Sequence, residues 1–93
     1  MSSYIYSKWH NSPENYPVEF YSELNNDRFE TRKVEIFKDG SLGFASQKAS
    51  SKTTKLGIAA VPPLNEIANQ AEFDIKTITP QQFEAKWKEA TEK

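Results

Sequence analysis

The chain has 93 residues, of which 37% are hydrophobic and 27% charged, and its 12 basic and 13 acidic side chains give a net charge of -1. This length fits one small domain, 1–93, and this composition excludes a disordered, collagen-like or coiled-coil chain. A balanced charge argues against nonspecific nucleic-acid binding, which depends on neutralising phosphates. The chain has no cysteine, which excludes disulfides and thiolate metal sites.

The N-terminal residues carry no basic stretch followed by a long apolar run, so no signal peptide is visible. No stretch approaches the roughly 20 apolar residues of a membrane span. We therefore expect a cytoplasmic protein that does not enter the membrane.

The first half of the chain predicts antiparallel strands. Alternating apolar and polar residues predict strands over 4–9 and 18–24, and a longer strand over 29–37. Asp39-Gly40 is the strongest hairpin signal, and residues 42–45 form the expected return strand.

The next segment, residues 46–55, is polar and contains three lysines without an acid. This composition predicts a mobile surface loop with few contacts to the core. Residues 55–58 are a candidate for a short edge strand.

The last third of the chain predicts two helices and a strand. Apolar residues at helical spacing predict a helix over 63–71, and residues 73–78 predict one more strand. Thr79 and Gln82 form a capping-box pattern that begins a helix over 80–91. The expected fold is an α+β domain: a twisted antiparallel sheet built from hairpins, with two helices packed on one face.

Two tight loops fix the expected register of this sheet: three residues over 25–27, and two residues at Asp39-Gly40. The resulting pairs join apolar residues and place small residues where helices can approach. These pairs are Val18 with Val34, Ile36 with Gly43, and Val34 with Ala45.

The same register leaves an apolar second face. Contiguous apolar surface of this kind marks a contact site, unless another segment of the chain covers it. The predicted partner-binding residues are an aromatic centre with an acidic rim: Tyr21, Phe29, Phe37 and Phe44, with Glu19, Glu23, Glu30 and Glu35.

Motifs for chemistry are weak. His10 is the only histidine, and a lone loop histidine is seldom catalytic. One histidine without cysteine also falls short of typical zinc ligation, and the three glycines are too dispersed for a phosphate loop. We therefore expect no enzyme activity, no metal and no cofactor.

Several short motifs follow one another along the chain: Tyr16-Pro17, Phe20-Tyr21-Ser22-Glu23-Leu24, Asp27-Arg28-Phe29-Glu30, Arg32-Lys33-Val34-Glu35, Phe37-x-Asp39-Gly40, Gly43-x-Ala45, Leu56-Gly57, 62–67, Glu72-Phe73 and Phe83…Trp87. This pattern, spanning roughly Tyr4 to Trp87, resembles a small bacterial family of uncharacterised single-domain proteins. The resemblance implies an α+β domain and assigns no activity or site residue.

The functional hypothesis is a non-catalytic protein-interaction module. Its most concrete form is a bacterial immunity or inhibitor protein that neutralises a basic partner, such as a toxin or nuclease domain, by direct binding. The protein acts as a monomer or a homodimer in this hypothesis. The alternative is a small nucleic-acid-binding or regulatory accessory protein that uses the basic segment 31–58, whose six bases and two acids give +4.

Overall fold

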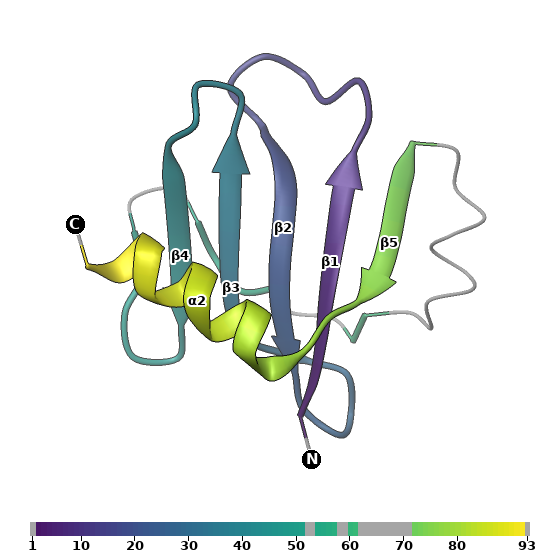
Figure 1. Ribbon diagram of the computed structural model, residues 1–93, viewed down its shortest axis with the longest axis vertical. Coiled ribbons are helices and arrows are strands. Elements are labelled where there is room, and N and C mark those ends of the chain that lie inside the picture. The colour runs from purple at the N-terminus through teal and green to yellow at the C-terminus, as the bar shows by residue number, and fades with distance from the viewer. Residues whose placement is uncertain (1, 52–53, 58–59, 62–71, 93) are drawn as a thin grey trace.

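A computed structural model describes residues 2–51, 54–57, 60–61 and 72–92. Five strands form one antiparallel sheet in the order β4-β3-β2-β1-β5, and a helix crosses it (Figure 1). The elements are β1 (Ser3–Trp9), β2 (Pro17–Leu24), β3 (Glu30–Phe37), β4 (Leu42–Ser46), β5 (Phe73–Thr77) and α2 (Pro80–Thr91).

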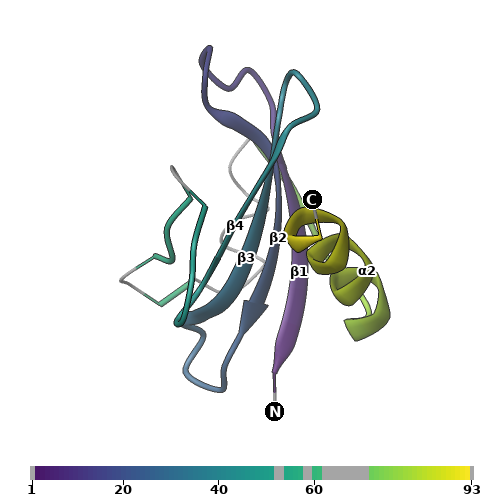
Figure 2. The same ribbon diagram turned by 90° about the vertical axis from the view of Figure 1, so that its left-hand side faces the viewer.

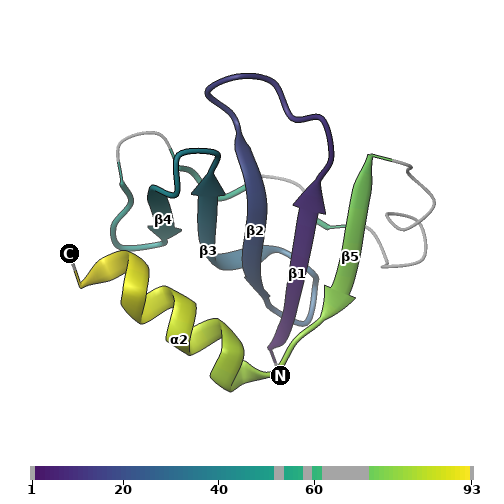
Figure 3. The same ribbon diagram turned by 45° about the horizontal axis from the view of Figure 1, so that its top comes forward.

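The expected pair of helices on one face is wrong. In the described part of the chain α2 is the only helix, and the predicted 63–71 helix lies outside the described residues. Helix α2 lies diagonally across one face of the sheet (Figures 1 and 3), and the segment after β4 lies against the opposite face (Figure 2). The sheet is therefore covered from both sides, by a helix and by an irregular segment.

Helix α2 begins where the sequence predicts. The Thr79 hydroxyl accepts a hydrogen bond from the Gln82 amide, and the Gln82 side chain accepts one from the Thr79 amide. Pro80 occupies the first turn, where its missing N–H costs nothing. Phe83, which follows, is fully buried, so the cap also fixes the residue that anchors the helix to the sheet.

Both hairpin loops close differently from the prediction. In the first, the Arg28 amide donates to the Asn25 carbonyl, and Arg28 has a φ of 66°. In the second, the Gly40 amide donates to the Phe37 carbonyl, and Gly40 has a φ of 86°. Each is a three-residue loop whose last residue is left-handed, over 26–28 and 38–40. The first loop is thus displaced by one residue from the predicted 25–27, and the second is one residue longer than the predicted Asp39-Gly40.

Two β-bulges shift the pairing of β2 and β3 further. The register changes between Glu23 and Leu24, where Thr31 is the extra residue, and again between Pro17 and Glu19. Val34 consequently lies opposite Tyr21 instead of Val18. The pairing is displaced by three residues, which is an odd number. Tyr21 therefore lies on the same face of the sheet as Val34, whereas the predicted register placed the two on opposite faces.

The β3–β4 pairing is displaced by one residue without any bulge. Ile36 lies opposite Leu42, and Val34 lies opposite Phe44. The expected pairs of these residues with Gly43 and Ala45 are wrong, because the loop is one residue longer than predicted. Leu42 and Phe44 therefore point toward α2.

The face opposite α2 is covered by residues 47–51, 54–57 and 60–61, here called the covering segment. Thr54 is fully buried, and its hydroxyl donates to the Glu35 carboxylate over 2.8 Å. Gly43 lies directly beneath the Thr54 side chain, so the glycine makes room for this segment and not for a helix. The prediction that 46–55 makes few core contacts is therefore wrong, and residues 55–57 form no strand.

Candidate protein-binding cleft

The eight predicted contact residues do not share one face. Their strand register and contacts place Glu19, Tyr21, Glu23 and Phe44 on the face under α2, and Glu30, Glu35 and Phe37 on the face of the covering segment, whereas Phe29 lies outside the strands and is 41% exposed. The single aromatic face inferred from the sequence is therefore wrong in its geometry. The assignment of these residues to partner binding remains a prediction.

The face under α2 is occupied by a charged cluster around Arg32. Its guanidinium lies 4.9 Å from the Phe83 ring centroid and 5.2 Å from that of Trp87. It forms ion pairs with Glu23 at 2.7 Å and Glu84 at 2.5 Å. These hydrogen bonds from Arg32 lower the pKa of the Glu23 carboxyl to about 2, and Glu23 in turn raises the pKa of Arg32. The cluster fastens α2 to the sheet.

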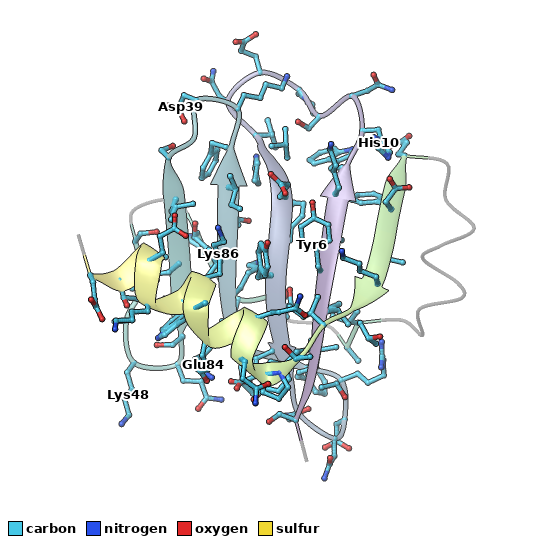
Figure 4. The ribbon with its side chains drawn as sticks, in the orientation of Figure 1. Tyr6, His10, Asp39, Lys48, Glu84 and Lys86 are labelled. Carbon is cyan, nitrogen blue, oxygen red and sulfur yellow. The ribbon has the colours of Figure 1, made fainter. Side chains whose placement is uncertain are left out.

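A second group of polar residues lies beside the first half of α2, where Figure 4 shows Tyr6 and Lys86. The Tyr6 hydroxyl donates to the Glu19 carboxylate over 2.5 Å, and burial together with this bond raises the pKa of Tyr6. Lys86 lies 5.6 Å from the Tyr21 ring centroid and pairs with Glu89. Glu19 and Tyr21 thus have intramolecular partners on this face.

An aromatic-lined cleft of about 420 Å³ lies on the other face, at the end of the sheet where β1 ends and β2 begins. Trp9 and Tyr16 meet edge to face with ring centroids 6.0 Å apart, and Phe73 stacks on Trp9 at 5.7 Å. Tyr16 is 54% exposed, more than Phe29 at 41%. We call this site the aromatic cleft; its lining is Trp9, Asn15, Tyr16, Pro17, Phe20, Glu35 and Phe37.

Strand register explains why these side chains converge. Phe20 lies opposite Glu35, and Phe37 lies two residues further along β3 on the same face. Trp9 stands two residues beyond Ser7, the β1 partner of Phe20. Asn15 adopts a φ of 70°, which bends the β1–β2 loop back toward the sheet just before Tyr16.

Glu35 is the only carboxylate in this lining and is only 8% exposed. One oxygen accepts the hydrogen bond from Thr54, and the other lies 3.9 Å from the Lys33 ammonium. Residues 14, 38, 39 and 41 line a smaller cleft of about 200 Å³ that shares Asn15, Tyr16 and Phe37 with the first. The two clefts together carry three carboxylates, from Glu14, Glu35 and Asp39, against one ammonium, that of Lys38.

Sequence reasoning found Glu35 and Phe37 but missed Trp9, Tyr16 and Phe20. The missed residues do carry a signal, because Trp9 and Phe20 are aromatic residues within alternating strands, and Tyr16 precedes a proline in a polar loop. Their convergence depends on the bulged register, and the predicted register did not place them together.

His10, the other residue considered for chemistry, pairs with Asp74 through Nε2 and Oδ2 at 2.8 Å, and both side chains are well exposed. Among the residues that the structure describes, no group of three or more histidine or carboxylate side chains is arranged to hold a metal ion. Within the same ranges, no helix has both the length and the apolar character needed to cross a membrane.

Comparison with known proteins identifies the family but gives no activity. No curated protein and no solved structure matches the chain. A family model described as a domain of unknown function, DUF6881, matches residues 3–92. The resemblance to a family without assigned function is thereby confirmed, and the chain belongs to the DUF6881 family.

Proposed function

We propose that the protein is a non-catalytic protein-interaction module that binds a basic partner through the aromatic cleft. The observation that carries this proposal is the cleft itself, with its exposed Tyr16 and its excess of carboxylates. Tyrosine and tryptophan dominate binding energy at protein interfaces, because they bury a large area and lose little conformational entropy.

Charge supports a basic partner. Among the described residues that line the two clefts, Lys38 is the only cation, and it donates to the Ser12 carbonyl over 2.7 Å. Lys33, whose ammonium lies 3.9 Å from Glu35, also pairs with Glu30, so part of the charge of both lysines is used within the chain. Figure 4 shows Asp39 and His10 at the same end of the molecule. A surface with excess carboxylates speeds the approach of a cationic protein and repels a second copy of itself. Inhibition of a basic toxin or nuclease is the most concrete form of this function.

The nucleic-acid alternative gains less from the structure. Of the six cations that it would use, Arg32 pairs with Glu23 and Glu84, Lys33 lies near Glu30 and Glu35, and Lys38 is bound to a carbonyl. Cations that already pair with carboxylates of the chain neutralise fewer phosphates, so they displace fewer counterions from a nucleic acid. Lys48 and Lys55 are exposed, and Lys52 lies outside the described residues.

Site-specific crosslinking tests the proposed function. A photoreactive phenylalanine analogue is placed at position 16 in the cleft or at position 88, an exposed site on α2, in the cells from which the gene comes. The proposal expects a protein crosslinked from position 16 and not from 88. That protein is then purified, and its affinity is measured against Tyr16→Ala and the control Lys88→Ala.

Tyr16→Ala is expected to weaken binding by at least 30-fold, which corresponds to about 2 kcal/mol. Lys88→Ala should leave the affinity unchanged. The proposal is wrong if the partner binds Tyr16→Ala as tightly as wild type, or if crosslinks form only from position 88. Light scattering of the free protein separates a homodimer from a partner complex.

A further inference from the structure

Resting on this proposed function, we propose that the aromatic cleft receives an arginine side chain of the partner protein, with its guanidinium against the aromatic rings and its N–H groups on Glu35. The proposal identifies the chemistry of the occupant. It stands on the unused acceptor capacity of Glu35, on the aromatic walls, and on a matching arrangement elsewhere in the molecule.

Glu35 has acceptor capacity that the described residues do not use. A carboxylate offers about four lone-pair positions. Glu35 uses one for the Thr54 hydroxyl, and its second oxygen has the Lys33 ammonium at 3.9 Å, which is beyond hydrogen-bond distance. A carboxylate on a side chain that is only 11% exposed gains from each further donor, because the surroundings screen its charge poorly.

The walls of the cleft suit a planar cation. Phe73 stacks on Trp9, and Tyr16 meets Trp9 edge to face, so neighbouring rings hold the indole in place. The faces of aromatic rings attract cations, and guanidinium stacks on them more readily than ammonium does. Guanidinium also presents parallel N–H groups that match a carboxylate.

The other face of the sheet already holds a guanidinium between aromatic rings and carboxylates of the same chain. Arg32 lies over the Phe83 and Trp87 rings, while Glu23 and Glu84 accept its N–H groups. The aromatic cleft has rings and a carboxylate as well, but none of the described residues that line it is cationic. The Lys33 ammonium, outside this lining, lies 3.9 Å from Glu35 and also pairs with Glu30. The partner's arginine is the cation that completes the combination in this cleft.

Two blocked peptides test this inference. They are identical apart from one central residue, which is arginine in one and citrulline in the other, the uncharged analogue of the same shape. Binding is followed by NMR through the two tryptophan indole N–H signals. Trp9 lies in the cleft, and Trp87 lies on the opposite face and serves as an internal control.

The inference expects the arginine peptide to shift the Trp9 signal saturably and to leave the Trp87 signal in place. The citrulline peptide should bind at least 10-fold more weakly. Glu35→Gln, which still accepts from Thr54, should weaken the arginine peptide by at least 10-fold, whereas the control Glu84→Gln should not. Equal binding of the two peptides would overturn the assignment to arginine, as would tighter binding of a third peptide that carries lysine at the central position.

The citrulline comparison uses the wild-type protein, so it decides even if Glu35→Gln fails to fold. Failures of the two proposals are distinguishable. If the crosslinked partner depends on Tyr16 but binds Glu35→Gln with wild-type affinity, the interaction module stands and the arginine assignment fails. If the arginine peptide binds and no partner depends on Tyr16, the cleft is a cation site and the proposed function fails.

Discussion

Glu23 couples the stability of the protein to pH. Its pKa is lowered from 4.5 to about 2 by Arg32, with further hydrogen bonds from Thr31 and Tyr4. A carboxyl with a depressed folded-state pKa stabilises the protein fully above its unfolded pKa. That stabilisation is lost as pH falls from about 5 toward 2.

We therefore predict that the wild-type unfolding free energy drops by about 2–3 kcal/mol over this interval through Glu23 alone. Glu23→Gln should remove this part of the pH dependence and lower stability at pH 7. Glu92→Gln, at an exposed site near the end of α2, is the matched control and should keep the wild-type slope. Urea titrations at pH 7, 4 and 2.5 measure the difference. An unchanged slope in Glu23→Gln would show that the cluster does not carry the charge coupling.

At the scale of elements, the covering segment packs closely on β4 at one point, where the Thr54 side chain lies against Gly43. A Cβ at Gly43 would collide with the Thr54 side chain, which is fully buried and cannot move aside. Gly43→Ala should therefore cost about 1–3 kcal/mol by overpacking. Gly57→Ala is the control, since its Cβ would meet only the flexible Glu30 carboxylate.

The double variant Gly43→Ala with Thr54→Ala distinguishes the cause. If the clash is the source of the loss, removing the Thr54 side chain should recover part of it, and the two substitutions should be non-additive. Thermal unfolding of the wild type, of Gly43→Ala and Thr54→Ala alone, and of the double variant measures this coupling. If the losses of stability from the two substitutions were strictly additive, the Thr54 side chain would not be the cause of the loss in Gly43→Ala.

The elements also show what sequence could and could not predict. The start of α2 was predictable, because Thr79, Pro80 and Gln82 act within one turn. The register of β2 and β3 was not, because it depends on the extra residue Thr31, an ordinary strand former without a turn signal. The same register limits what could be predicted of the cleft. Glu35 and Phe37 lie on one strand, so the sequence placed them on one face, whereas Trp9 and Tyr16 come close to them only in the bulged register of the sheet.

For the whole molecule, the two tryptophans report on opposite sides of one sheet. Trp87 packs against Phe44 and Phe83 under α2, and Trp9 packs against Phe73 at the aromatic cleft. If both sides unfold together, as expected for one small domain, they must share one transition.

The variants Trp9→Phe and Trp87→Phe each leave a single fluorescent reporter. The unfolding of each variant in urea is followed by tryptophan fluorescence and by circular dichroism. Within each variant, the fluorescence midpoint should equal the ellipticity midpoint. A fluorescence midpoint that precedes the ellipticity midpoint in one variant only would show that this side of the sheet opens independently.

The position of β1 between β2 and β5 has a consequence for synthesis on the ribosome. Strands β1 to β4 can pair as soon as they emerge, but the second edge of β1 waits for β5, residues 73–77. Until then, a nascent chain presents the backbone groups of Tyr4, Tyr6 and Lys8 as an open edge, which other nascent chains can pair with. A chain that terminates before β5 is consequently expected to aggregate, because β5 is the strand that covers this edge of β1 and protects it against self-association.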